Sequence, residues 1–343
     1  MTEPSTAVES PPDVGTPHTL HLLGPEVVDS LFDLDLAYTT QHEAFVKLAR
    51  GDSWQPDKIG GGHAADESTL FCYASRLDRR TGPVSKFGSV NPTNSAVGKP
   101  TIHATVTLLH PTTGIPVAIL DGTAITARRT AAASALAARA LALPGADTVA
   151  VLGAGQQALS HIRALHAVLD AATFRIWAPR AAQIDEAVLT LTGEGISVVT
   201  AETIRSALDN ANIVVTATRS TEPLFEAQDL TPGSLVISVG SFEEHRREIG
   251  LDTLRRSSDI VVDHAPTAEA HSGPIVNMRS HGDLTALVEL GSVLTDSARV
   301  RSSPNHSGIV TYLSVGLGVQ DAAAAWAIYE KAQTLGLCTE VPW

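Results

Sequence analysis

Three basic residues have the side-chain type and position to act on a small anion. Arg128 and Arg129 lie near the start of a predicted Ala-rich helix, where a cation is disfavoured by about 0.3–1 kcal/mol. A bound phosphate or carboxylate would offset that cost, because a guanidinium offers two parallel donors to either group. Lys86 lies in a predicted strand and could bind a carboxylate or donate a proton in a cleft. The alternative is that all three are solvated surface charges.

The stretch 148–165 has the pattern of a dinucleotide-binding turn. An apolar strand runs into Gly153, Gly155 and Ala158, and a helical segment follows. Gly153 permits the tight turn, and Gly155 lets a diphosphate approach the backbone, where the helix N-terminus favours an anion. The alternative is an ordinary strand–turn–helix that binds nothing. The residues expected to face the cofactor here are Gly153, Ala154, Gly155, Gln156 and Gln157.

The end of the next predicted strand bears on the choice between NAD(H) and NADP(H). An acidic residue at this position would bind the ribose 2′-hydroxyl and reject a phosphate. The sequence instead reads Ala178-Pro179-Arg180, and Arg180 could meet a 2′-phosphate. We therefore favour NADP(H), with NAD(H) possible, and Ala178 and Arg180 are predicted to contact the cofactor. The alternative is that Arg180 only caps a loop.

Composition excludes several classes of protein. The 343 residues carry a formal net charge of −13, which argues against a nucleic-acid or anionic membrane partner. Cys72 and Cys338 are the only cysteines, which is too few for a disulfide framework. No apolar run reaches membrane-spanning length, and residues 1–17 are expected to be a disordered tail without a signal pattern. We expect a cytoplasmic protein.

Motifs for hydrolytic or metal chemistry are missing from the sequence. The 13 histidines show no metal-ligand spacing, so no metal is expected. His103 is interpreted as structural, and His161 and His166 as solvated residues of the helix that follows the glycine turn. The sequence has no Gly-x-Ser-x-Gly motif, so no residue pattern indicates a hydrolase.

The periodicity of apolar residues predicts an α/β protein. A helix is expected over 25–50, ended by Gly51, and a polar glycine-rich loop over 51–67. Strands over 20–23, 69–77, 83–90, 101–109 and 115–120 predict a mostly antiparallel sheet in the first third. After an Ala-rich helix from residue 121, strands over 149–152, 174–177, 197–200, 213–216, 235–239 and 260–263 predict a doubly wound parallel sheet. A final helix over 320–335 is expected to return to the first domain.

Lys86 and the segments 113–121, 126–134, 149–155, 217–218 and 314–321 together resemble the ornithine cyclodeaminase/mu-crystallin family, from about Leu20 to the C-terminus. The resemblance implies a homodimer with two domains per chain. A substrate and dimerisation domain, 18–130 completed by 315–343, would stand beside a Rossmann domain, 131–314, that binds a nicotinamide cofactor. Arg129 matches the family arginine that reaches the cofactor phosphate and the substrate carboxylate, and Lys86 matches the family lysine at the substrate. The further cofactor contacts implied are Thr101, Ala217, Thr218, Val239, Gly240, Ser314 and Gly316.

Two positions depart from the family pattern. Lys58 stands where an arginine usually completes the carboxylate clamp, so the charge remains but the forked donor is lost. Phe242 stands where the cyclodeaminases place an aspartate that handles the substrate amine. We expect Lys58, Lys86, Arg129 and Phe242 to contact the substrate, and the pocket to be shaped by the loop 51–67 with Phe71, Phe87 and Phe242.

The missing aspartate favours a reductase. The predicted reaction is NAD(P)H-dependent reduction of an imine, formed as a ketimine or from a 2-oxo acid plus an amine, with Lys86 and Arg129 as catalytic residues. The first alternative is an ornithine or lysine cyclodeaminase with retained NAD, in which Glu243 or Glu244 replaces the missing acid. The second alternative is a non-catalytic protein that binds NADP(H) and a small ligand.

Overall fold

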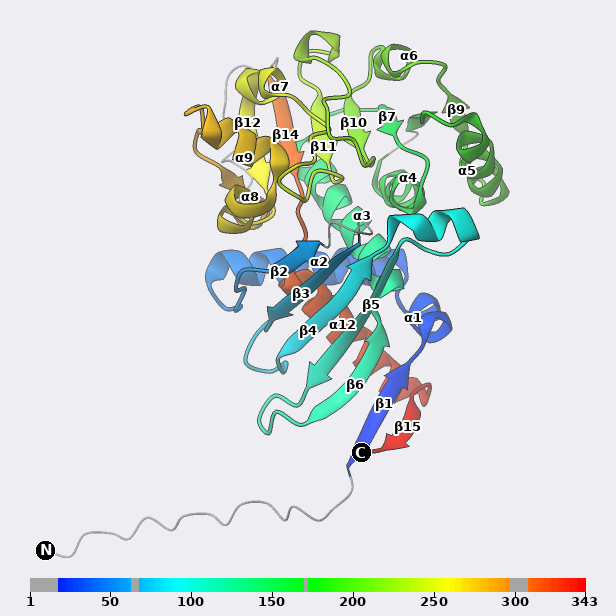
Figure 1. Ribbon diagram of the computed structural model, residues 1–343, viewed down its shortest axis with the longest axis vertical. Coiled ribbons are helices and arrows are strands. Elements are labelled where there is room, and N and C mark those ends of the chain that lie inside the picture. Colours follow the sequence, from blue (N-terminus) through cyan, green and yellow to red (C-terminus); the bar gives the residue numbers. More distant parts are fainter. Residues whose placement is uncertain (1–17, 63–67, 170–171, 297–307) are drawn as a thin grey trace, which may run out of the picture.

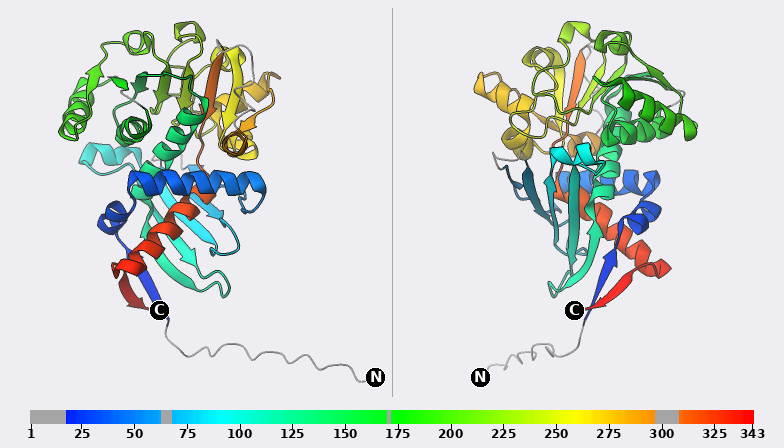
Figure 2. Two further views of the ribbon diagram at one scale, coloured as in Figure 1. Left: turned by 180° about the vertical axis from the view of Figure 1, so that it is seen from behind. Right: turned by 45° about the vertical axis from the view of Figure 1, so that its right-hand side comes forward.

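The computed structural model describes residues 18–62, 68–169, 172–296 and 308–343, and these form two sheets with helices packed against them (Figure 1). The two sheets lie at opposite ends of the molecule, and helix α2 (Leu34–Arg50) crosses between them (Figure 2). None of the helices in the described ranges is long and apolar enough to cross a membrane.

The first sheet has the strand order β15-β1-β6-β5-β4-β3-β2. All neighbours are antiparallel except β1 and β6. Its strands are β1 (Thr19–Leu23), β2 (Ile59–Gly62), β3 (Thr69–Ser75), β4 (Val84–Val90), β5 (Ile102–Leu109), β6 (Pro116–Asp121) and β15 (Thr339–Pro342). The predicted hairpin between β5 and β6 is confirmed, and Gly114 at its turn has φ of 72°. A 3-10 helix, η1 (Pro92–Val97), follows β4.

One face of this sheet is covered by α1 (Pro25–Leu31), α3 (Gly122–Leu141) and α12 (Gly318–Leu335). Side chains of β4 alternate, so that Val84, Lys86 and Val90 point to the buried face while Phe87 points away. This alternation follows from the pleat of a strand. It places a lysine among apolar neighbours, and that placement is the first sign of a functional role.

Two expectations for this domain were wrong. The helix expected over 25–50 is two helices, because the side chain of Asp33 accepts a hydrogen bond of 2.8 Å from the backbone N–H of Leu36 and starts α2 anew. The loop expected over 51–67 contains strand β2, whose glycines pair with β3. Gly-rich segments have low strand propensity, so pairing with a neighbour rather than local preference forms this strand. Residues 63–67 lie outside the described ranges.

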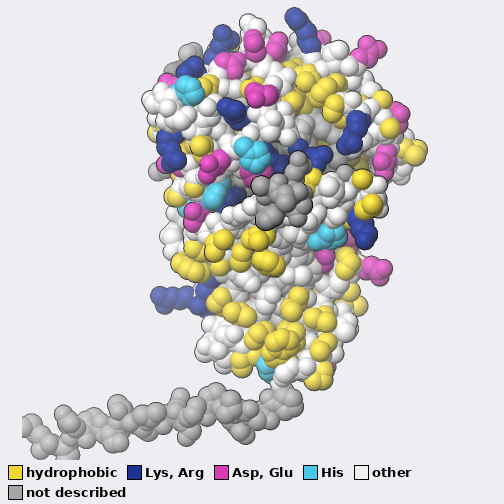
Figure 3. Space-filling view, viewed as in Figure 1, with side chains coloured by type: hydrophobic (Ala, Val, Ile, Leu, Met, Phe, Trp, Pro, Cys, Tyr) yellow, Lys and Arg dark blue, Asp and Glu magenta, His cyan; other side chains and the backbone are white. Residues whose placement is uncertain are grey.

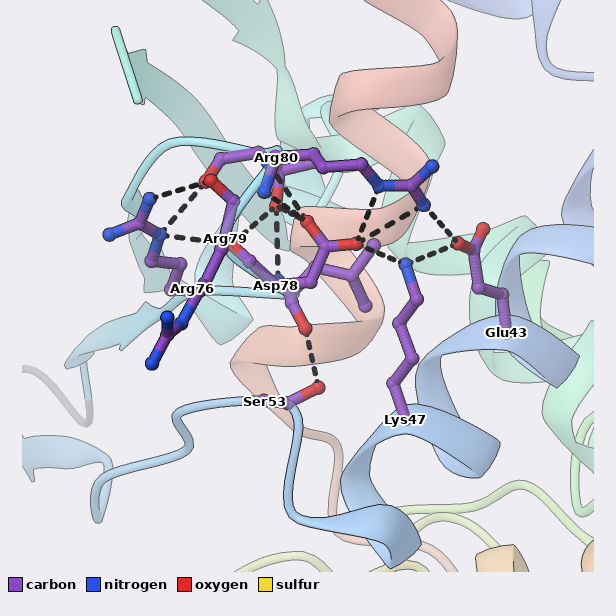
Figure 4. Close-up of polar contacts among 9 residues, drawn as sticks. Glu43, Lys47, Ser53, Arg76, Asp78, Arg79 and Arg80 are labelled. Carbon is purple, nitrogen blue, oxygen red and sulfur yellow. Dashed lines mark hydrogen bonds and ion pairs between the residues drawn. The ribbon is translucent and has the colours of Figure 1, made fainter. Parts of the chain in front are cut away.

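A network of charged side chains fixes the turn between β3 and β4 on α2 (Figure 4). Lys47 of α2 forms ion pairs with Glu43 and with Asp78 of the turn, and Arg80 also pairs with Asp78. The pKa of the Asp78 carboxyl is lowered, since hydrogen bonds from Lys47 and from the backbone outweigh its partial burial. The network therefore holds the hairpin whose strands carry the polar residues of the site.

The second sheet is entirely parallel, with the order β13-β12-β14-β11-β10-β7-β8-β9. Its strands are β7 (Thr148–Leu152), β8 (Thr173–Trp177), β9 (Val198–Thr200), β10 (Ile213–Thr216), β11 (Leu235–Ser238), β12 (Ser257–Val262), β13 (Val288–Glu289) and β14 (Ile309–Leu313). From β9 to β14 the order is that of a Rossmann sheet, whose ligands bind where the order reverses, between β7 and β10. The short strand β13 and the strand β14 were not expected from the sequence.

Helices and 3-10 turns connect these strands on both faces of the sheet (Figure 1). They are α4 (Gln156–Val168), α5 (Ala181–Gly193), α6 (Ile204–Leu208), η2 (Ala227–Asp229), α7 (Leu251–Arg256), α8 (Ala265–His271), α9 (Gly273–Ser280) and α10 (Leu290–Thr295). The α/β class with a doubly wound parallel sheet and a smaller mixed sheet is confirmed.

The two halves share buried residues as well as the connecting helix α3. Phe45 of α2 belongs to the apolar core beneath the second sheet, whereas Ala44 belongs to the core of the first. After β14 the chain crosses back, and the alanines at 322–325 of α12 are buried against the first sheet. The final helix thus packs on the first sheet, and β15 then pairs with β1, which was not expected.

Candidate active site

The turn after β7 has the backbone shape that a dinucleotide requires. Gly153 has φ of 130°, and a Cβ at this position would lie 2.5 Å from the carbonyl oxygen of Ala217. At Gly155 a Cβ would meet nothing within 4 Å, so the space above this backbone is open. Ala158 is fully buried where α4 packs against the sheet. These residues fit the roles predicted for them: a tight turn, an open approach and close helix packing.

The start of α4 fits the diphosphate of a nicotinamide dinucleotide. The helix has 13 residues and begins at Gln156 at the carboxyl edge of β7, so its dipole and first N–H groups favour an anion there. The side-chain oxygen of Gln157 is buried and has no hydrogen-bond partner among the described residues. Gln157 also lines the cavity described next. Residues 154–157 thus form the turn and the start of α4, with Gln157 at the edge of the cavity.

A cavity of about 490 Å³ lies between the two sheets, at the carboxyl edge of the second. Side chains of both domains line it. They include Lys58, Phe71, Tyr73, Lys86, Thr126, Arg129 and Thr130 from the first, and Gln157, Val239, Phe242, Glu243, Ser314 and Gly316 from the second and the returning chain. A cavity of this size with a few convergent polar groups is the usual form of a small-molecule site.

Lys86 is the most buried cation of the cavity, with an exposed fraction of 1%. Its Nζ donates hydrogen bonds to Oγ1 of Thr126 at 2.6 Å and to Oδ1 of Asp321 at 3.0 Å. The rings of Phe71 and Tyr73 lie 5.8 and 5.5 Å from the same nitrogen. Burial lowers the pKa of Lys86 to about 8, although Asp321 opposes this shift. A lysine with this pKa exchanges a proton near neutral pH.

Arg129 lies on α3 beside Lys86 and is 4% exposed. One terminal nitrogen donates to Oε1 of Gln320 at 3.0 Å, and its Nε lies 3.5 Å from Oδ1 of Asp321. Gly316, at φ of 80°, leaves room for the guanidinium, because a Cβ there would lie 2.9 Å from it. The glycine predicted as a cofactor contact thus also positions the arginine.

Lys58 reaches from the first domain to the second. Its Nζ donates to the carbonyl oxygens of Phe242 at 3.3 Å and Val315 at 3.2 Å. Burial lowers its pKa to about 8, with Asp263 acting in the opposite direction. Lys58, Lys86 and Arg129 therefore converge on one cavity, so the solvated-surface alternative is wrong for Lys86 and Arg129.

Two buried acids of the site were missed by sequence reasoning. Asp321 is fully buried and contacts both Lys86 and Arg129. Asp263, 1% exposed, accepts hydrogen bonds of 2.8 Å from the backbone N–H groups of Val315 and Gly316. Burial raises the pKa of Asp263. Asp321 stands in the first turn of α12, where the helix dipole favours an acid in any case, so its position carried no separate signal of a role at the site.

A third missed residue, Glu248, holds the loops that follow β10 and β11. Its carboxylate accepts hydrogen bonds from the backbone N–H groups of Thr218 and Gly240, and from hydroxyls of Thr216, Thr218 and Ser238, over 2.5–3.0 Å. A Cβ at Gly240 would lie 2.2 Å from the carbonyl oxygen of Thr218. The segments Ala217–Thr218 and Val239–Gly240 are thereby fixed beside each other at the carboxyl edge of the second sheet, with Ala217 next to the end of β7.

The predicted residues for cofactor selection lie farther out. Ala178 is 6% exposed at the end of β8, and Arg180 is exposed in the residue that precedes α5. Its side chain is thus available to a ligand at the ribose end of the turn. Thr101, expected beside the cofactor, accepts a backbone hydrogen bond from Asn91. It lies next to Ile102, which lines the cavity.

Arg128, for which a functional and a surface role were both left open, faces away from the cavity and pairs with Asp29 at 2.9 Å, as the surface alternative described. Two expectations were wrong. Phe87 is 57% exposed, because it alternates with Lys86 and therefore lies on the opposite face of the sheet. His161 is fully buried rather than solvated and lies 2.9 Å from the Ser134 hydroxyl. Among the described residues, no group of His, Cys, Asp and Glu side chains could hold a metal ion.

Comparisons with known proteins identify relatives of this chain. The model of the ornithine cyclodeaminase/mu-crystallin family matches residues 22–335. Mouse ketimine reductase mu-crystallin is 32% identical over 239 residues, which is 69% of this chain and 72% of the mouse protein. The structure of Thermococcus litoralis Δ1-pyrroline-2-carboxylate reductase with NADH and L-proline has a TM-score of 0.89 at 27% identity, covering 94% of this chain and 100% of the other. An archaeal alanine dehydrogenase dimer with bound NAD has a TM-score of 0.85 at 26% identity, covering 95% and 100%.

Proposed function

The chain belongs to the ornithine cyclodeaminase/mu-crystallin family, and from that premise we propose that it is an NAD(P)H-dependent reductase of imines, an oxidoreductase acting on C=N bonds. The observation that carries this function is the cavity, in which Lys58, Lys86 and Arg129 converge at the carboxyl edge of the Rossmann sheet. Relatives named as a ketimine reductase and a pyrroline-2-carboxylate reductase support it.

The proposed reaction uses these residues in distinct roles. A reduced nicotinamide dinucleotide, held at the glycine turn by residues 153–157, would supply the hydride for the imine carbon. Lys86 Nζ donates a proton to the imine nitrogen, so that the C=N bond becomes CH–NH. The forked donors of Arg129 and the ammonium of Lys58 hold the neighbouring carboxylate. Asp321 holds both Lys86 and Arg129 in place.

A direct assay tests this function. The purified protein is mixed with NADPH or NADH and a cyclic ketimine carboxylate, or with a 2-oxo acid plus an amine, and the absorbance of the reduced cofactor is followed. We expect oxidation of the cofactor that depends on the imine. NADPH and NADH are tested separately, each under conditions in which it binds. The proposal would be contradicted if no imine of a broad panel led to oxidation of either cofactor.

We propose that NADP(H) is preferred over NAD(H). Support comes from Arg180, which is exposed after β8, and from the absence of an acid in the segment Ala178-Pro179-Arg180. Arg180→Ala is expected to raise the KM for NADPH at least tenfold and to leave the KM for NADH nearly unchanged. An equal effect on both cofactors would contradict the assignment of Arg180 to the 2′-phosphate.

The second candidate function is a cyclodeaminase that retains NAD. Glu243 and Glu244 both line the cavity, and this placement is the observation that supports the candidate. However, Glu243 binds Arg246 at 2.6 Å, and the position of the family aspartate holds Phe242. The cyclodeaminase would release ammonia from ornithine or lysine without net turnover of the cofactor. The reductase proposal expects no ammonia.

We propose that the protein is a homodimer formed by the first domain. On the face shown in Figure 3, hydrophobic side chains gather over the first sheet. The exposed apolar residues of these strands include Leu22 and Phe87, on the face that the helices leave uncovered. An unpaired apolar sheet face favours association. Light scattering after gel filtration would check the mass, and Phe87→Lys should weaken the dimer.

We also propose a reducing compartment, the cytoplasm, because Cys72 and Cys338 are free thiols.

A further inference from the structure

We propose that the imine substrate carries a bulky apolar substituent, with an aromatic ring as the best fit, held between Phe71 and Phe242. This inference rests on the proposed reductase function and goes beyond it by naming the substrate class. It depends on where the charged residues and the apolar residues lie within the cavity.

Along β3 and β4, the side chains that point into the cavity change from charged to apolar between one pair of facing residues and the next pair on the same face. Lys86 of β4 is paired with Tyr73 of β3, and two residues further Gly88 is paired with Phe71. Two residues of a strand span about 6.6 Å. A substrate whose imine nitrogen lies at Lys86 can therefore direct its substituent toward Phe71.

Phe71 is held in a defined position. Its ring lies over Gly88, where a Cβ would come within 2.6 Å of the ring, and it stacks on Tyr73 with ring centroids 5.4 Å apart. A glycine at position 88 thus makes the space that the ring fills. The ring also lines the cavity, so one wall of the substituent site is a fixed aromatic surface.

Phe242 forms a wall contributed by the second domain. The guanidinium of Arg246 lies 4.7 Å from the centre of its ring, and Arg246 is itself bound to Glu243 at 2.6 Å. Lys58, next to β2, donates to the backbone oxygen of Phe242. Phe242 lines the same cavity as Phe71 and the residues of β2. An apolar group between Phe71 and Phe242 would gain contact with both.

The strand opposite Phe71 leaves room for such a group. Gly60 of β2 is paired with Phe71, so a side chain at position 60 would point to the same face as the ring. A Cβ at Gly60 would have its nearest neighbour at 3.5 Å, the backbone oxygen of Leu70. A side chain at position 60 would therefore not be crowded by nearby atoms. Because Gly60 has no side chain, the cavity beside Phe71 is wider.

The three cations of the cavity match one carboxylate. Lys58, Lys86 and Arg129 bring three positive charges, and the buried Asp263 and Asp321 offset two of them. Glu243, Glu244, His245 and His271 also line the cavity, but Glu243 is already bound to Arg246 at 2.6 Å and His271 to Asp57 at 2.8 Å. A charged substituent between Phe71 and Phe242 would lose hydration against the two rings, so an apolar substituent fits this part of the cavity.

The test compares three 2-oxo acids that form imines with excess methylamine and differ only in the substituent: pyruvate, phenylpyruvate and oxaloacetate. The cofactor-loaded protein should show a kcat/KM for the benzyl compound at least tenfold above both others, because apolar pocket contacts discriminate by about 10–200-fold. Turnover of the pyruvate imine that equals or exceeds that of the phenylpyruvate imine would overturn the substrate class and leave the reductase function intact.

If none of the three imines is reduced, calorimetry on the cofactor-loaded protein separates the two proposals. Hydrocinnamate that binds at least tenfold more tightly than propionate would support the apolar site while the reductase function fails. Equal binding would overturn the apolar site as well.

A pair of variants locates the site on β2. Gly60→Val places a side chain opposite Phe71 and should reduce the ratio of benzyl to methyl kcat/KM at least fivefold. Gly61→Val is the matched control, because position 61 faces the other way and its Cβ would meet nothing within 4 Å. A ratio that stays constant in Gly60→Val, or falls equally in both variants, would contradict the placement.

Discussion

The Nζ of Lys86 lies 3.0 Å from Oδ1 of Asp321, a residue 235 positions later in the chain. Strand β4 supplies the lysine and the returning helix α12 supplies the acid. Both side chains are buried, so this ion pair lies where water cannot screen it. Asp321 also contacts Arg129, which makes it the residue through which the two proposed catalytic cations are held together.

The first prediction concerns the pH dependence of the reductase. Burial lowers the pKa of Lys86 to about 8, and the proposed role needs its protonated form. The kcat/KM should therefore be constant below about pH 7 and fall as the pH rises through 8. Lys86→Met should lower kcat/KM by about 10²–10⁴ and abolish this fall. A profile that keeps the same descending limb in Lys86→Met would assign the titration to another group, with Lys58 the next to test.

The second prediction concerns the buried acid. Asp321→Asn removes the negative charge beside two buried cations, and breaking a buried pair in this way costs about 3–5 kcal/mol. The free energy of unfolding, measured with urea, should fall by that amount. Asp29→Asn is the matched control, since it removes the partner of Arg128 on the surface and should change stability by less than about 1 kcal/mol. Equal effects in the two variants would contradict the assignment.

The third prediction separates cofactor binding from folding at the glycine turn. Gly155→Ala adds a Cβ that meets no protein atom within 4 Å, so the variant should fold with unchanged stability. The methyl group would occupy the space of the diphosphate, and the Kd for the nicotinamide cofactor should rise at least tenfold. Unchanged affinity, measured by fluorescence titration, would place the cofactor elsewhere. Gly153→Ala should instead destabilise the fold, because its Cβ would lie 2.5 Å from a backbone oxygen.

The fourth prediction concerns acid stability. Burial lowers the pKa of His161 to about 4 from an ordinary value of 6.5, so the folded protein keeps this ring neutral. Above about pH 6.5 the neutral ring of His161 costs no stability. As the pH falls from 6.5 toward 4, the unfolded chain binds a proton on this ring that the folded protein does not, so the free energy of unfolding decreases. The loss is about 3 kcal/mol, since each unit of pKa difference is worth about 1.4 kcal/mol. His161→Gln should flatten the dependence of unfolding free energy on pH in this window. A slope equal to that of the wild-type protein would show that other groups cause it.

Features set by a few neighbouring residues could be predicted from the sequence. The glycine turn at 153–155, the hairpin between β5 and β6 and the end of α2 at Gly51 each depend on local backbone preferences. Local pattern made Lys86 and Arg129 candidates but left a surface role open, and the resemblance to the family assigned them to the substrate.

Features set by contacts between distant segments could not be predicted. Asp321, Asp263 and Glu248 become site residues only when strands and helices from both domains meet. Strand β2 forms because β3 offers a partner, although its sequence is Ile-Gly-Gly-Gly. His161 is buried because α3 packs on α4, where the Ser134 hydroxyl meets its ring. The helical pattern of α4 alone does not reveal which neighbour covers it.

The return of the chain after β14 has a consequence for biosynthesis. A ribosome releases the Rossmann sheet before it releases α12 and β15, so that sheet can assemble while the first one still lacks its edge strand and its covering helix. The acid that pairs with Lys86 and Arg129 belongs to α12 and emerges after every strand of the second sheet. A nascent chain therefore completes the cavity between the two sheets only after the whole second sheet has been synthesised.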